Sequence, residues 1–173
     1  MTEIQNRKQV TLSDKEAGRL RQLRETLNAA NVDCALLAHD LTIRSAQERV
    51  EHGFGELANM APTFILRSET GYLAAIIRGD TRLSYKKIKQ KLKLKNLCLA
   101  TPEQVRQVTG SEVGHVSLIN AGVVTIVDSR LTELDTGYGG CGVPCYTLKI
   151  NPQDLITLAQ AQVFDFTEPK DKA

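Results

Sequence analysis

The segment TGSEVGHVS, residues 109–117, carries residue types suited to holding a ligand. Gly110 and Gly114 have no side chain, so backbone amide groups beside them can approach a bound molecule closely. His115 and Ser117 could add polar groups, but they lie two positions apart with no obvious acid partner, so a catalytic triad has no support. The alternative interpretation is a plain turn that leads into a strand.

Two other places in the sequence hold residue types found in binding sites. Gly139 and Gly140 form a glycine-rich run that lacks the lysine and hydroxyl residue of a phosphate-binding loop, so we expect a turn that lines a pocket. His39 follows an apolar stretch that is typical of a strand. A lone histidine at a strand end is more often structural or exposed than catalytic, and both interpretations stay open.

The cysteines and histidines do not form a metal-binding pattern. Cys34, Cys98, Cys141 and Cys145 lack the close spacing of a four-ligand zinc site, and the three histidines make no recognisable ligand pair. We therefore expect no bound metal and no other cofactor. A redox role for the pair Cys141 and Cys145 is the weaker alternative to plain buried thiols.

A lysine-rich stretch is the candidate surface for nucleic acid. Six lysines occur at positions 86, 87, 89, 91, 93 and 95, and the apolar residues between them recur at helical spacing. A helix with lysines on its open face suits the phosphate backbone of RNA, and we assign tRNA binding to Lys86, Lys87 and Lys89. The alternative is a solvated helix face that binds nothing.

Helices and strands that intermix would position these residues. Capping-box patterns at Ser13 and Ser45 open two helices, and a Thr-Pro pair at residue 101 opens another. We expect helices at 13–31, 45–53, 84–92, 101–110 and 152–159, and strands at 32–38, 63–67, 72–78, 97–100, 123–127, 145–150 and 163–166. Because the order is not a strict βαβ alternation, the predicted fold class is α/β of the α+β kind, a single domain around a mixed sheet.

Length and composition fit one globular domain, with 173 residues, 42% apolar and 24% charged. We expect a flexible lead at 1–12, the domain at 13–167 and a frayed tail at 168–173. The net charge of +2 is too small to argue for general nucleic-acid binding, so DNA is not an expected partner. The sequence shows no apolar run near the ~20 residues of a membrane span and no apolar signal segment, so we expect no membrane partner and a cytoplasmic location.

Several segments occur in the order found in a known family. They are residues 83–92, 95–103, 108–117, 124–128, 139–140, 148–150, 154–155 and 161–165. Together, over about residues 19–166, they resemble the YbaK-like aminoacyl-tRNA deacylases, the family of the editing domain of bacterial prolyl-tRNA synthetases. The resemblance implies a small mixed sheet or barrel, often described as crumpled, flanked by helices.

The same resemblance implies hydrolysis of the ester between a wrong amino acid and its tRNA, without a metal or a covalent nucleophile. By position, backbone groups of Gly114 and His115 would hold the ester, and Asp128 would support the pocket. The residues that would border the pocket are His39, Ser117, Gly139 and Gly140. The implied partner is aminoacyl-tRNA, and the family tends to act as a monomer or a homodimer.

Two positions depart from the family pattern. Pro62 stands where many members have a lysine, and Leu118 stands where the glycine motif has a proline. The main expectation is a free-standing hydrolase that edits mischarged tRNA in trans, which the matching Gly114 and Asp128 favour. The departures favour the alternative, a catalytically impaired module that binds aminoacyl-tRNA or a small ligand on the same fold.

Overall fold

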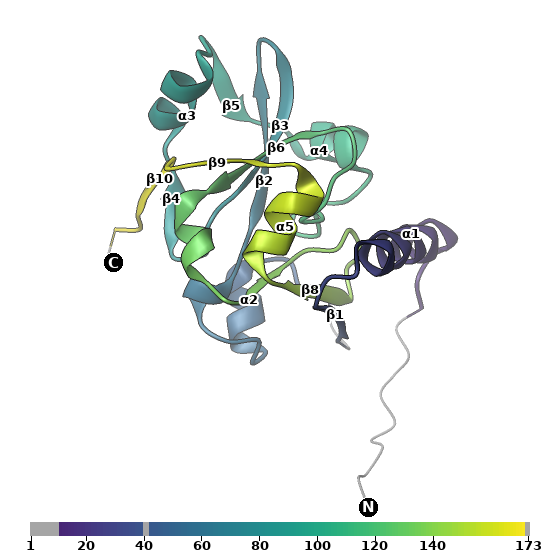
Figure 1. Ribbon diagram of the computed structural model, residues 1–173. Helices are drawn as coiled ribbons and strands as arrows, with labels where there is room; N and C mark the ends of the chain where they lie inside the picture. Colours follow the sequence, from purple (N-terminus) through teal and green to yellow (C-terminus); the bar gives the residue numbers. More distant parts are fainter. Residues whose placement is uncertain (1–10, 40–41, 172–173) are drawn as a thin grey trace, which may run out of the picture.

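The computed structural model describes residues 11–39 and 42–171 (Figure 1). Its helices are α1 (Asp14–Ala30), α2 (Ala46–Glu51), α3 (Tyr85–Leu92), α4 (Pro102–Thr109) and α5 (Pro152–Ala159), with short 3-10 turns η1 (Leu57–Asn59) and η2 (Ser129–Glu133). None of the helices in this described part is long and apolar enough to cross a membrane. The predicted flexible lead covers residues 1–12, and residues 1–10 of it lie outside the described part of the chain.

Helix starts follow the capping residues in the sequence. At α1 the Ser13 hydroxyl accepts a hydrogen bond from the Glu16 backbone N–H, and the Glu16 carboxylate accepts one from the Ser13 backbone N–H. Thr101 and Gln104 make the same pair of hydrogen bonds at the start of α4. At α2 only half of the pattern forms, because Ser45 caps the Glu48 N–H but the Glu48 carboxylate accepts from Arg44 instead. The capping signals therefore predict these helices and their first residues.

The strands form three small sheets. A five-stranded sheet has the order β5 (Leu97–Leu99), β2 (Thr63–Ser68), β3 (Gly71–Ile76), β6 (Val124–Asp128), β9 (Gln162–Phe164). A three-stranded sheet has the order β1 (Cys34–Ala38), β8 (Tyr146–Ile150), β7 (Gly137–Gly139), and β10 (Thr167–Pro169) pairs with β4 (Thr81–Leu83). The predicted mixed α/β fold with flanking helices is confirmed, and its strands are divided among three separate sheets.

One parallel pairing places the glycine segment in the fold. β3 and β6 run parallel, with Leu73 opposite Val124, so the chain must cross back from one end of the sheet to the other. That crossover carries β4, α3, β5 and α4, and the glycine segment lies in it between α4 and β6. The site is therefore built on a connection that is anchored at both ends by the central sheet.

The largest core cluster joins α1 to this connection. Leu20, Leu23 and Leu27 line the inner side of α1 and pack in one cluster with Leu118 and Leu148. All five side chains are buried, and each buried leucine contributes about 1.5–3 kcal/mol of hydrophobic stabilisation. Figure 1 shows α1 lying along the side of the molecule where β8 runs, which makes α1 a wall of the region around the glycine segment.

The end of the chain differs from the expected frayed tail. β10 pairs antiparallel with β4, the Thr167 side chain is fully buried, and the Lys170 ammonium donates to the Gly79 carbonyl at 2.7 Å. A three-residue strand that contains a proline has no alternating pattern to reveal it, and its stability comes from a distant partner. The prediction of a tail that frays from residue 168 is therefore wrong as far as Asp171, and residues 172–173 lie outside the described residues.

Candidate functional site

The glycine segment is a tight turn pressed against the backbone that leads into α2. Gly114 has a φ of +90°, and a Cβ atom there would collide with the Arg44 carbonyl oxygen. The turn is closed by the His115 N–H, which donates to the Glu112 carbonyl at 3.0 Å. Only glycine fits both the backbone angle and the close approach at this position.

A second glycine run packs directly on the first. The Leu118 N–H donates to the Gly140 carbonyl at 3.0 Å, and the Gly142 N–H donates to the His115 carbonyl at 2.9 Å. A Cβ atom on Gly140 would collide with the Val116 carbonyl oxygen, so the two backbones touch without side chains between them. The structure thus brings together two segments that the sequence keeps more than twenty residues apart.

The departure at Leu118 has a structural reason. Its side chain is fully buried, and a Cβ atom on Gly139 would lie 2.7 Å from it. Its N–H donates to Gly140, a bond that a proline could not make. In this chain a leucine at position 118 therefore holds the two glycine runs together by a hydrogen bond and by packing.

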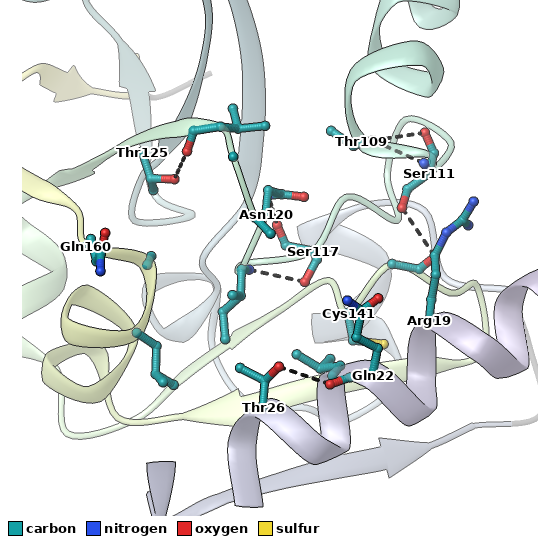
Figure 2. Close-up of a pocket in the computed structure, with 18 of the residues that line it drawn as sticks. Arg19, Gln22, Thr26, Thr109, Ser111, Ser117, Asn120, Thr125, Cys141 and Gln160 are labelled. Atoms are coloured by element: carbon teal, nitrogen blue, oxygen red, sulfur yellow. Dashed lines mark hydrogen bonds between the residues drawn. The ribbon is translucent and has the colours of Figure 1, made fainter. Parts of the chain in front are cut away.

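A cavity of about 770 Å³ lies on one side of this junction. Its walls come from α1, the C-terminal ends of α4 and α5, the connection 117–125 and residues 141–142. Ser117 lines it, and Figure 2 shows Ser117 above Cys141, which itself sits over α1 near Arg19 and Gln22. Its lining includes the guanidinium-bearing Arg19 and several amides and hydroxyls, so it suits a polar ligand.

Polar side chains gather at a different place, where β1 and β8 meet α2. The His39 Nε2 lies 3.2 Å from the Thr147 hydroxyl, and the Arg49 Nε donates to the same hydroxyl at 3.2 Å. His39 follows β1 and Thr147 lies in the adjacent β8, so the sheet pairing sets their contact. Arg49 and Thr147 were not expected from the sequence, where nothing shows that this arginine turns inward.

His115 faces the charges of this second cluster. Its side chain is buried, and its Nε2 has no hydrogen-bond partner among the described residues. Burial lowers the pKa of His115, and the charges of Arg44 and Arg49 lower it further. The ring is therefore neutral at pH 7, and its role at that pH is that of a neutral donor or acceptor.

Asp128 is a structural carboxylate in this fold. It is fully buried, its Oδ1 accepts from the Phe166 N–H at 2.9 Å, and its Oδ2 accepts from the Arg130 N–H at 3.1 Å. The first bond ties the end of β6 to the segment between β9 and β10, the second caps η2, and neither goes to the glycine segment. From this position Asp128 can support the site only through the sheet.

The three lysines assigned to tRNA differ in their surroundings. The Lys87 ammonium bonds to both oxygens of Asp165 and to the Thr167 carbonyl, whereas Lys86 is exposed and Lys89 is half-buried. Figure 1 shows α3 at the end of the molecule away from α2 and β1. The lysine face therefore lies far from the glycine segment, where it could contact only another part of a large ligand.

Two of the four cysteines, Cys141 and Cys145, are buried thiols, whereas Cys34 is half-buried and Cys98 is exposed. Cys141 and Cys145 are both buried and unbonded to each other, and burial raises the pKa of Cys141 to about 11. Burial also raises the pKa of Cys145. Thiols that stay protonated at pH 7 are poor nucleophiles, so this environment does not favour a redox role.

Comparison with known proteins identifies the family. The sequence model of the aminoacyl-tRNA editing domain matches residues 42–158, more than half of the chain. The chain belongs to the aminoacyl-tRNA editing domain family. The resemblance seen in the sequence is thereby confirmed, and both glycine runs and Arg49 lie inside the matched region, whereas α1 and His39 precede it.

Relatives of this editing domain occur in longer proteins. A proline–tRNA ligase of Caldicellulosiruptor saccharolyticus is 25% identical over 127 residues, 73% of this chain and 22% of that protein. The proline–tRNA ligase of Moorella thermoacetica is 33% identical over 92 residues, 52% of this chain and 16% of that protein. The chain thus spans about a fifth of the length of the curated relatives it matches.

Solved structures share the fold over nearly their whole length. The crystal structure of hypothetical protein APE2540 is 26% identical with a TM-score of 0.79, covering 85% of this chain and 99% of that one. A protein proposed to be a trans-editing enzyme for prolyl tRNA synthetase is 23% identical with a TM-score of 0.78, covering 91% of this chain and 99% of that one. The editing-domain fold is therefore established for this chain.

Proposed function

We propose that this editing domain is a deacylase that acts in trans and hydrolyses the ester of mischarged tRNA. Water adds across the bond between the carbonyl carbon of the amino acid and the ribose oxygen, giving a free amino acid and an uncharged tRNA. An aminoacyl ester is already labile, so positioning it and stabilising the oxyanion of the tetrahedral intermediate can supply the catalysis. No cofactor is part of this proposal.

The observation that carries the proposal is the double glycine junction within the family-matched region. Backbone approaches backbone there without side chains, and among the described residues no acceptor is found for the N–H groups of Gly114 and Val116. Such donors suit the carbonyl and developing oxyanion of an ester. In this proposal the N–H groups of Gly114 and Val116 contact the ester, and His115 between them fixes their position because its own N–H and carbonyl bond to Glu112 and Gly142. The residues that border the ester are His39, Ser117, Gly139 and Gly140, with Asp128 supporting from the sheet.

The test is single-turnover hydrolysis of a panel of aminoacyl-tRNAs, including tRNAPro charged with a wrong amino acid. Wild type is compared with Gly114→Ala and with Gly71→Ala. Both glycines have positive φ, but a Cβ atom would collide with backbone only at Gly114 and would meet open space at Gly71. We expect wild type and Gly71→Ala to hydrolyse the same species and Gly114→Ala to lose that activity.

A second candidate function is a binding module without catalysis. Pro62, which carries no charge, favours it. Flat time courses for wild type over the whole panel, with tRNA retained on a filter, would overturn the deacylase and establish the binding module. Equal loss of activity in Gly114→Ala and Gly71→Ala would show that backbone strain, and not the close approach at Gly114, accounts for the effect.

A further inference from the structure

Arg49 is a buried cation without a counter-ion. Helix α2 begins after Ser45 and turns the Arg49 side chain inward, where the residue is only 5% exposed. Its guanidinium stays charged at any physiological pH, yet none of the ion pairs in the described chain includes it. The neighbouring Glu48 carboxylate acts on Arg49 only at a distance, because it forms no ion pair with Arg49 and accepts from the Arg44 N–H at 2.8 Å.

A charge in this situation is costly to the free protein. Buried charges in proteins are normally paired, because removal from water is not repaid by a single neutral hydrogen bond. Here the Arg49 Nε has such a neutral bond, to the Thr147 hydroxyl at 3.2 Å. An anion that docked beside the guanidinium would supply the missing interaction.

The outer part of the guanidinium is open to a ligand. Among the described residues, two side-chain atoms are both fully buried and without a hydrogen-bond partner, namely Thr63 Oγ1 and His115 Nε2. The two outer nitrogens of the Arg49 guanidinium do not belong to this set, so each is either hydrogen-bonded or in contact with solvent. Since the described chain offers these nitrogens no hydrogen bond either, they keep contact with solvent.

We propose that Arg49, with the Thr147 hydroxyl bonded to its Nε, forms a phosphate-binding subsite for the nucleotide that carries the amino acid. This inference rests on the proposed function, because the ligand chemistry comes from aminoacyl-tRNA. The ester is neutral and the amino group of the amino acid is a cation, which Arg49 repels. The anion nearest to the ester is the phosphate of the terminal nucleotide, and a planar guanidinium binds phosphate with two parallel hydrogen bonds.

Titration with nucleotide fragments tests the subsite without any hydrolysis. The probes are adenosine 5′-monophosphate, adenosine and glutarate, at matched ionic strength, with binding followed by thermal shift and by amide NMR spectra. We expect adenosine 5′-monophosphate to raise the Tm of wild type and to perturb amides around Arg49, and adenosine to bind at least tenfold more weakly. Binding of glutarate in preference to the nucleotide would overturn the phosphate assignment in favour of an acidic amino-acid side chain.

Substitutions separate the subsite from a structural role. We expect Arg49→Met to bind adenosine 5′-monophosphate at least tenfold more weakly while its Tm without ligand equals or exceeds that of wild type. Arg49→Lys, which keeps the charge but not the planar fork, should bind with intermediate affinity and serves if Arg49→Met does not fold. Arg21→Met, which removes an exposed arginine of α1, is the control and should bind as wild type does.

Two results would overturn the proposal. One is unchanged nucleotide affinity in both Arg49 variants, and the other is an Arg49→Met protein that is less stable than wild type yet binds the nucleotide equally well. If wild type hydrolyses no aminoacyl-tRNA but binds the nucleotide through Arg49, the deacylase fails and the subsite stands. If hydrolysis is seen but Arg49→Met changes only the saturating rate and not the tRNA concentration required, the subsite fails and the deacylase stands.

Discussion

The His115 ring illustrates how single residues take their properties from their surroundings. Burial comes first among the causes that lower the pKa of His115, followed by the charges of Arg44 and Arg49. The sequence shows only a histidine beside a glycine, and none of these three causes can be seen in it. The position of His115 in a candidate site was therefore predictable, whereas its neutral state was not.

This lowered pKa predicts a pH dependence of stability. The unfolded chain binds a proton at His115 near pH 6.5 and the folded chain binds it only at lower pH, so the stability present above pH 6.5 falls as the pH drops through this window. One proton gives a slope of at most about 1.4 kcal/mol per pH unit. Urea unfolding between pH 7.5 and 5 should show a smaller loss for His115→Gln than for wild type.

The exposed His52 provides the control for this measurement. His52→Gln should follow wild type, because the side chain lies in the exposed turn after α2. Identical pH profiles for wild type and His115→Gln would contradict the prediction and place the acid sensitivity of the protein in other groups.

At the scale of elements, helix α3 combines structural and available lysines. Lys87 bonds to Asp165 and to the Thr167 carbonyl, so it fastens α3 to the segment between β9 and β10. Lys86 and Lys95 are exposed on the same element and its following turn. The amphipathic spacing predicts the helix and its open face, but it cannot show which lysine is used inside the fold.

This difference predicts separate outcomes for two kinds of substitution. If α3 binds RNA phosphates, Lys86→Glu with Lys95→Glu should weaken tRNA binding and flatten the dependence of log K on log salt by about 1 for each lysine–phosphate pair removed. Lys87→Met should chiefly affect stability, by less than about 1 kcal/mol, because its ion pair is partly exposed. Filter binding over a salt series measures the first, and an unchanged slope would make α3 a solvated face.

Short elements with distant partners limit what the sequence can predict. The five helices and most strands follow from capping residues and apolar spacing, but β4, β7 and β10 have three residues each and no alternation to detect. β7 lies within the run Gly137–Gly139, whose glycines predict a turn. It becomes a strand because β8 offers it hydrogen-bonding partners, which is a property of the assembled fold.

For the whole molecule, Asp128 joins parts that lie far apart in the chain. Its two oxygens accept from Phe166 and Arg130, and its side chain is fully buried. Asp128→Ala would leave two backbone N–H groups without their acceptor and should cost roughly 2–4 kcal/mol of unfolding free energy. Urea denaturation measures this, with the exposed Asp135→Ala as a control that should change stability little.

The same variants separate structural from catalytic importance for Asp128. Asp128→Asn keeps one acceptor oxygen and should lose less stability than Asp128→Ala. Under conditions where both remain folded, we expect the hydrolysis rate per folded molecule to stay close to that of wild type. A large loss of rate in folded Asp128→Asn would place the carboxylate in the chemistry itself.

The central sheet also determines when the protein can finish folding during its synthesis. Strand β6 lies between β3 and β9, and β9 follows β6 in the chain only after β7, β8 and α5. Until the ribosome releases β9 and β10, one edge of β6 and the partner edge of β4 stay open, although both strands were synthesised long before. Open strand edges invite pairing with other chains. The nascent protein is thus most prone to aggregate just before β9 and β10 emerge, and these two strands also complete the attachment of α3.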